Sequence, residues 1–101
     1  MIGYSMNEDT MTLMLSGEVD HHSAAAMRKE ADELIKNYRP KKLIMNFRGV
    51  NFCDSSGIAL VLGRYKLVNE MGGTVSVVGA SKPTERIFTM ANMERFVNIE
   101  R

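Results

Sequence analysis

Residues 43–57 read Leu43-Ile44-Met45-Asn46-Phe47-Arg48-Gly49-Val50-Asn51-Phe52-Cys53-Asp54-Ser55-Ser56-Gly57. The apolar run at 43–47 predicts a β-strand that is covered on both of its faces. The residue types at 54–56, Asp, Ser and Ser, accept hydrogen bonds from the free N–H groups at the start of a helix. This segment therefore predicts a strand that leads into a helix, which is the repeating unit of an α/β fold.

The sequence after Ser55 has the periodicity of one long helix, whose apolar residues recur at spacings of three and four. Gly72-Gly73 is a typical helix end, and residues 74–78 predict the next strand. Ser81-Lys82-Pro83 predicts the cap and first turn of a third helix ending near Ala91, and residues 96–99 predict a last short strand. The expected apolar face of the long helix is Ile58, Val61, Leu62, Tyr65 and Val68, widened by Leu60 and Leu67.

The sequence before residue 43 predicts two strands and one helix. Residues 2–6 and 11–16 predict strands joined by a turn at Asn7-Glu8-Asp9. A helical repeat from Ala24 to Tyr38 follows, and Pro40 ends it. The predicted order is β-β-α-β-α-β-α-β, in one domain that spans residues 1–101. Because strands and helices alternate, we expect a mixed, mostly parallel sheet of about five strands with helices packed on it.

The composition is that of an ordinary globular domain, with 45% hydrophobic and 25% charged residues in a chain of 101. Thirteen basic and twelve acidic residues are mixed along the chain, which argues against direct nucleic-acid binding. No apolar run approaches the roughly 18–20 residues that span a bilayer, and the N-terminus does not resemble a signal peptide. The only cysteine, Cys53, excludes an intramolecular disulfide. We therefore expect a cytoplasmic protein that does not bind membranes.

The segment Asp54-Ser55-Ser56-Gly57 carries the chemistry, and its residue types allow two interpretations. The first is a well-capped helix and nothing more. The second is a phosphorylation site, because a helix N-terminus has an effective charge of about +0.5 and accommodates a phosphate group. Phosphorylation adds about −1.5 to −2 charges, which beside Asp54 would repel an acidic partner surface. The residue types alone do not decide between the two.

Catalysis and metal binding receive less support. Asp20, His21 and His22 could supply an acid and a base, but Ser55 lacks the G-x-S-x-G setting of a hydrolase because Cys53 stands where glycine would be. Adjacent histidines point in different directions, so no shared metal is expected. Cys53 is interpreted as a small buried hydrophobic residue. We expect no enzyme activity and no cofactor.

Three segments occur in an order that is typical of one family. They resemble anti-sigma factor antagonists of the STAS class, and the resemblance is strongest to the antagonists of the forespore sigma factor pathway in sporulation. It covers nearly the whole chain. The segments are Gly17-Glu18-Val19-Asp20-His21-His22-Ser23-Ala24, Phe52-Cys53-Asp54-Ser55-Ser56-Gly57-Ile58 and Leu62-Gly63-Arg64-Tyr65-Lys66.

The resemblance implies a partner switch. The unphosphorylated protein would bind an anti-sigma factor that is also a serine kinase, and would thereby free the sigma factor. Phosphorylation on Ser55 would release the antagonist, and a serine phosphatase would reset it. Asp20, Asp54 and Gly57 would shape the partner surface or the phosphorylation site, with Ser56 mainly structural. The protein is expected to be a monomer.

Two other functions stay open. One, in the same class, is a general stress-response antagonist. The other, from a different class, is a STAS subunit of a transporter or a lipid-transfer complex. The resemblance departs from the family pattern at one point. Members usually continue past the last strand into a C-terminal helix, whereas this sequence stops at Arg101.

Overall fold

The computed structural model describes residues 2–100 and confirms the predicted order of elements. A hairpin comes first, three helices alternate with the later strands, and a short 3-10 turn precedes the last strand. The elements are β1 (Gly3–Asn7), β2 (Thr10–Val19), α1 (His21–Tyr38), β3 (Lys42–Cys53), α2 (Ser56–Glu70), β4 (Thr74–Val78), α3 (Lys82–Met90), the 3-10 turn η1 (Met93–Arg95) and β5 (Asn98–Ile99).

The strands form one five-stranded sheet in the order β1-β2-β3-β4-β5. The β1–β2 pair is antiparallel, and the other three pairs are parallel. The prediction of a mixed, mostly parallel sheet is confirmed. The register of β2 against β3 shifts twice, between Met14 and Ser16 and between Gly17 and Glu18. Such bulges bend and twist the strand locally.

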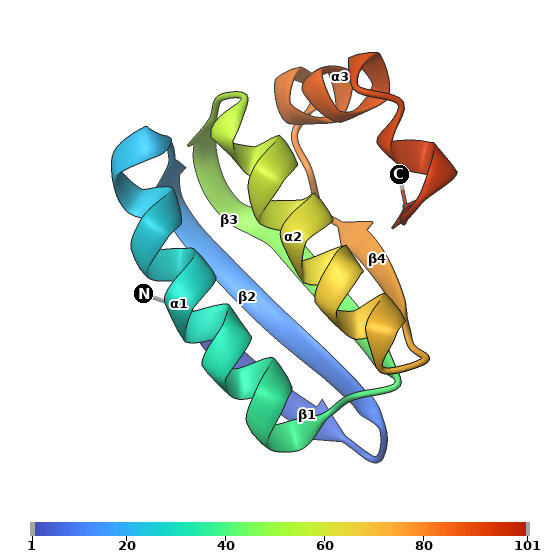
Figure 1. The fold of residues 1–101 in the computed structure, drawn as a ribbon. Helices are drawn as coiled ribbons and strands as arrows, with labels where there is room; N and C mark the ends of the chain where they lie inside the picture. Colours follow the sequence, from blue (N-terminus) through green and yellow to red (C-terminus); the bar gives the residue numbers. More distant parts are fainter. Residues whose placement is uncertain (1, 101) are drawn as a thin grey trace.

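Helices α1 and α2 lie side by side on one face of the sheet, and α3 lies near its upper end (Figure 1). The ring of Phe88 on α3 meets Phe47 of β3 edge to face, with their centroids 5.4 Å apart. The core fills the space between the helices and this face of the sheet. Its most deeply buried side chains include Met11, Leu13, Leu15, Ile35, Leu43, Met45, Phe47, Val61, Val68, Phe88 and Met93.

The prediction that the strand at 43–47 is covered on both faces is wrong. Leu43, Met45 and Phe47 are buried, but Ile44 and Asn46 between them are only half-buried. The reason is that α1 and α2 lie on the same face of the sheet, so alternate side chains of β3 meet different surroundings. This strand is also longer than predicted and continues to Cys53.

The predicted helix ends are confirmed within a few residues. The helix α1 begins at His21 and ends at Tyr38, and Arg39 after it adopts a left-handed conformation before Pro40. Gly72 has a positive φ of 85° just after α2, and Ser81 caps α3. The strand predicted at 11–16 extends over Thr10–Val19, and the last strand is limited to Asn98–Ile99. Within residues 2–100, the helices are all too short or too polar to cross a bilayer.

Candidate functional site

The carboxyl ends of β2 and β3 bring together the residues that the sequence singled out. Val19 pairs with Cys53 in the parallel ladder, and the N–H of Asp54 donates to the carbonyl of Val19 at 3.1 Å. Asp20 and Asp54 therefore follow neighbouring positions of adjacent strands. Because each strand leads directly into a helix, the N-termini of α1 and α2 lie at the same end of the molecule (Figure 1). In open α/β sheets, binding sites usually lie at this edge, outside the carboxyl ends of the strands.

The carboxylate of Asp54 caps the first turn of α2, and the hydroxyl of Ser55 does not. Oδ1 of Asp54 accepts a hydrogen bond from the N–H of Ser56 at 2.8 Å. Ser55 occupies the N-cap position with near-helical backbone angles of −63° and −13°, and its side chain makes no capping hydrogen bond. The Ser55 side chain is exposed, whereas Ser56 is half-buried. The hydroxyl of Ser55 is thus both accessible and uncommitted to the helix.

Asp20 caps α1. Its Oδ1 accepts from the N–H groups of His22 and Ser23 at 2.9 and 2.8 Å, and Oγ of Ser23 accepts from the N–H of Asp20 at 3.1 Å. This reciprocal pair is a capping box with serine in the place of the usual glutamate. The hydrogen bond from the Ser23 backbone is the main reason that the pKa of Asp20 is lowered. The carboxylate is therefore held in its charged form at the helix N-terminus.

Gly57 allows the chain to pass closely over Cys53. A Cβ atom on Gly57 would collide with Sγ of Cys53 and would touch the ring of Phe88 at 3.4 Å. Cys53 is buried, as the sequence predicted, and burial with the nearby charge of Asp54 raises its pKa to about 11. The thiol stays protonated at neutral pH, which suits a structural residue better than a nucleophile.

A groove of about 240 Å³ runs between α1 and α2 beside the serine pair. Most of its lining side chains are small, and the larger polar ones, His21 and Arg28, come from α1. Ser56 forms part of the α2 wall. The lining residues are His21, Ala24, Ala25, Arg28, Ser56, Ala59 and Leu60.

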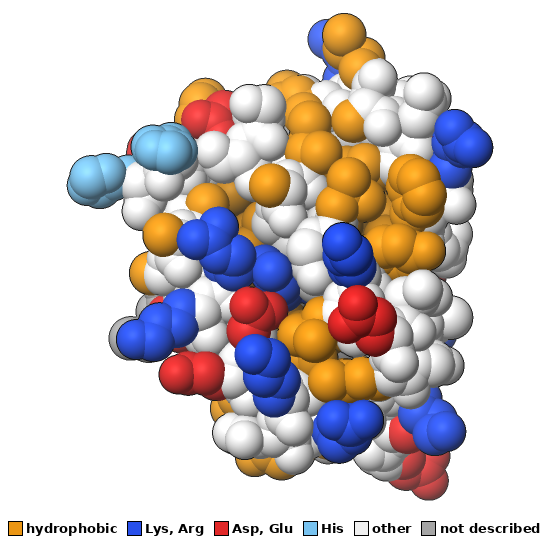
Figure 2. All heavy atoms as spheres, in the orientation of Figure 1, with side chains coloured by type: hydrophobic (Ala, Val, Ile, Leu, Met, Phe, Trp, Pro, Cys, Tyr) orange, Lys and Arg blue, Asp and Glu red, His pale blue; other side chains and the backbone are white. Residues whose placement is uncertain are grey.

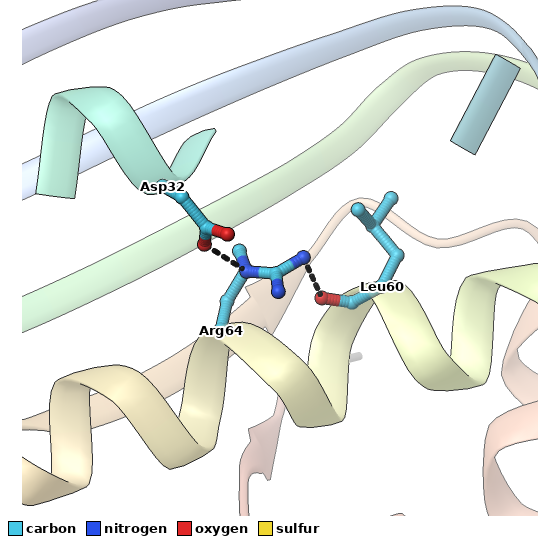
Figure 3. Close-up of polar contacts among 3 residues, drawn as sticks. All are labelled: Asp32, Leu60 and Arg64. Carbon is cyan, nitrogen blue, oxygen red and sulfur yellow. Dashed lines mark hydrogen bonds and ion pairs between the residues drawn. The ribbon is translucent and has the colours of Figure 1, made fainter. Parts of the chain in front are cut away.

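An ion pair that no sequence motif indicated joins α1 to α2 (Figure 3). Arg64 is 5% exposed, and its Nε lies 2.8 Å from Oδ1 of Asp32, while its Nη1 donates to the Leu60 carbonyl at 3.3 Å. Nε and Oδ1 have no hydrogen-bond partner among the described residues, so their contact is an ion pair only. Burial lowers the pKa of Arg64, and the positive charge of Arg28 lowers it further. The negative charge of Asp32 acts in the opposite direction and raises the pKa of Arg64. The available signal was the spacing of Leu60, Arg64 and Val68, which places Arg64 on the buried stripe.

The surface around this end is divided by residue type. In Figure 2, apolar side chains gather over α2 and α3, whereas most of the charged ones lie lower on α1 and α2. Phe52 is exposed two positions before Asp54, with 52% of its surface accessible, and its residue type alone indicated no role for it. In the part of the chain that the structure describes, no three His, Cys, Asp or Glu side chains gather as a metal site would need.

Comparison with known proteins identifies relatives of this arrangement. The STAS domain family profile matches residues 4–101. The anti-sigma F factor antagonist of Paenibacillus polymyxa is 34% identical over 89 residues, which cover 88% of this chain and 76% of that protein. The anti-sigma-B factor antagonist of Bacillus subtilis (strain 168) is 22% identical over 98 residues, covering 97% and 88% of the two chains.

Solved structures of the anti-sigma factor antagonist SpoIIAA have the same fold. Its unphosphorylated form superposes with a TM-score of 0.83 at 25% identity, covering all of this chain and 89% of that one. Its phosphorylated form, from Bacillus, superposes with a TM-score of 0.76 at 25% identity, covering 100% of this chain and 92% of that one. The resemblance found in the sequence is confirmed. The chain belongs to the STAS domain family, and the relatives named above are anti-sigma factor antagonists.

Proposed function

We propose that this protein is an anti-sigma factor antagonist of sporulation that is switched off by phosphorylation of Ser55. The observation that carries the proposal is the division of roles at the start of α2. Asp54 caps the helix, which leaves the Ser55 hydroxyl exposed and without a capping hydrogen bond. The related anti-sigma factor antagonists support an anti-sigma factor as the partner. The phosphorylated form of SpoIIAA supports phosphorylation as the switch.

The proposed cycle has two states. Unphosphorylated, the protein binds an anti-sigma factor that is also a serine kinase, and the sigma factor is freed. Phosphorylated on Ser55, it no longer binds until a serine phosphatase removes the group. In this cycle the protein is a monomeric, cytoplasmic kinase substrate with no catalysis of its own.

Electrostatics explain how one phosphate can act as the switch. The free N–H groups and dipole of α2 can hold the phosphate at Ser55. The added charge of about −1.5 to −2 stands beside Asp54, and an acidic group on a docked partner is then repelled at short range. The backbone need not move, because preorganised domains usually change little on binding.

The test is phosphorylation by a candidate anti-sigma factor kinase from the same organism. With ATP present, mass spectrometry should locate one phosphate on Ser55. The variant Ser55→Ala should remain unmodified, and the matched variant Ser56→Ala should still be modified. The phosphorylated protein should bind the kinase about tenfold more weakly or worse, a difference of roughly 1.4 kcal/mol. Phosphate on Ser56 would overturn the site assignment.

A second candidate function is a general stress-response antagonist, favoured by the similarity to the anti-sigma-B factor antagonist. The two functions use the same switch and differ in the sigma factor that is released. Adding the unphosphorylated protein to purified complexes of the kinase with each sigma factor separates them. Release of a stress sigma factor without release of a forespore sigma factor contradicts the sporulation assignment.

A further inference from the structure

Arg28 is an exposed cation on the wall of the groove between α1 and α2. Among residues 2–100 it forms no ion pair, because the neighbouring carboxylates are engaged elsewhere. Asp32, one turn along α1, pairs with Arg64 instead. Glu30 accepts a hydrogen bond from the backbone N–H of Ile2 at 3.2 Å. The fold thus leaves one guanidinium beside the groove without a counter-charge from the described residues.

Positive charge exceeds negative charge around Arg28. Its charge is close enough to the buried guanidinium of Arg64 to contribute to lowering the pKa of Arg64. Within the described part of the chain, Asp32 pairs with Arg64, and no carboxylate pairs with Arg28. An added carboxylate would relieve the repulsion between the two guanidinium groups and would form a charge-assisted hydrogen bond with Arg28. The groove is therefore complementary to an acidic group.

The size of the groove indicates what kind of molecule carries that group. Its volume of about 240 Å³ is below the roughly 300 Å³ at which small-molecule sites begin. Three alanines, Ala24, Ala25 and Ala59, form much of its lining and leave room for a side chain of a docked protein.

We propose that this groove receives an acidic side chain of the anti-sigma factor, whose carboxylate pairs with Arg28. This inference rests on the proposed function, since it names the contact that the switch would control. Ser56 lies on the groove wall, next to the proposed phosphorylation site. A phosphate on Ser55 would repel the incoming carboxylate, because charges within the Debye length of about 8–10 Å are poorly screened. Phosphorylation of Ser55 would then control whether the groove can bind the partner's carboxylate.

The first test reverses the charge at Arg28. We expect Arg28→Glu to bind the anti-sigma factor kinase at least about tenfold more weakly by calorimetry, as is usual for loss of a paired interfacial charge. Lys29→Glu is the matched control, because Lys29 is an exposed cation on the same helix outside the groove. It makes the same change in net charge and should alter affinity less than about twofold. Arg28→Lys should retain most of the affinity.

The second test fills the groove without touching a charge. Ala25 and Ala26 are both exposed on α1, but only Ala25 lines the groove. Ala25→Leu should therefore weaken kinase binding about tenfold, and Ala26→Leu should not. Because both positions are exposed, both variants should keep the unfolding midpoint in urea of the parent protein.

The outcomes separate this inference from the proposed function. If the parent protein neither binds the kinase nor is phosphorylated, both ideas fail. If it binds and is phosphorylated on Ser55 while Arg28→Glu or Ala25→Leu binds like the parent, the groove is not the contact and only this inference fails. Weakening in both variants, with both controls unchanged, supports it.

Discussion

Ser55 and Ser56 are neighbours in sequence but lie in different surroundings. Ser55 is exposed and its side chain does not cap α2, while Ser56 is half-buried and its backbone N–H is held by Asp54. A kinase active site must reach the hydroxyl that it modifies, and that favours Ser55. The structure thus supplies a physical reason for the choice that the family resemblance made by position alone.

Replacement of Gly57 by alanine should destabilise the fold. The new methyl group would meet Sγ of Cys53 and the ring of Phe88, and overpacking of this kind costs about 1–3 kcal/mol. That cost exceeds the gain of up to about 1 kcal/mol that alanine brings to a helix interior. Urea unfolding of Gly57→Ala should show the loss directly.

Two further variants isolate the cause of that loss. In a Cys53→Ala background the collision partner is gone, so adding Gly57→Ala should cost less than about 1 kcal/mol. Gly63 lies on the same helix, and a methyl group added there would meet no atom of the described residues within 4 Å. Gly63→Ala should therefore stabilise the protein slightly. Equal destabilisation at positions 57 and 63 would refute the collision argument.

At the scale of elements, an aspartate precedes each of the two helices that reach the site. Asp20 caps α1 and Asp54 caps the first turn of α2, and each carboxylate accepts backbone N–H bonds. These two residues were expected to shape the site, and their first role is to start the helices that form the groove. Any contact that they also make with a partner stays a prediction.

The cap at Asp20 should make stability depend on pH. The pKa of Asp20 is lowered in the folded protein, mainly by the hydrogen bond from the Ser23 backbone. Its contribution is therefore fully present above the unfolded-state pKa of about 3.9, and is lost as pH falls through the lower folded-state value. Asparagine caps helices well but carries no charge. The stability difference between the parent and Asp20→Asn should be larger at pH 7 than at pH 3 in urea unfolding.

The control for this pH effect is Glu33→Gln, which removes the same charge from an exposed position on α1 that is remote from the cap. Surface substitutions of this kind usually change stability little. The difference between the parent and Glu33→Gln should therefore change less between pH 7 and pH 3 than the difference between the parent and Asp20→Asn. A parent-to-Asp20→Asn difference that does not change with pH would contradict the assignment of the cap.

At the scale of the whole molecule, the parallel pairing of β2 with β3 and the helices on one face of the sheet create the site. The carboxyl ends of β2 and β3 are adjacent because Val19 pairs with Cys53, and the helices that follow lie on one face (Figure 1). The Arg64–Asp32 pair joins those two helices across their interface (Figure 3). The width of the groove therefore depends on how this layer is held together.

Removal of Asp32 should loosen the layer. Asp32→Ala leaves the buried guanidinium of Arg64 without a counter-charge, and because Asp32 is itself 29% exposed we expect a loss of about 1–3 kcal/mol. The double variant Asp32→Ala with Arg64→Met should be more stable than Asp32→Ala alone, since no unpaired charge remains. Glu33→Ala, an exposed change on the same helix, should shift the urea midpoint little. A single variant as stable as the parent would show that the pair contributes nothing.

The sequence by itself determined the elements, their order and the start of α2 at this end of the sheet. These features depend on local rules: periodicity for α1 and α2, capping residue types at positions 54–56, and Pro40 and Gly72 after the helices. Local rules act over a few residues, so a single chain displays them. The family resemblance added the assignment of Ser55, which residue types alone left open.

Only the tertiary structure decided which side chains meet across elements. It placed both long helices on one face, so Ile44 and Asn46 are half-buried where a doubly covered strand was predicted. It also paired Arg64 with Asp32, which leaves Arg28 beside the groove without an ion pair among residues 2–100. Such pairings depend on sheet register and on the alignment of α1 against α2. Both are set by contacts between residues far apart in the chain, which no local pattern encodes.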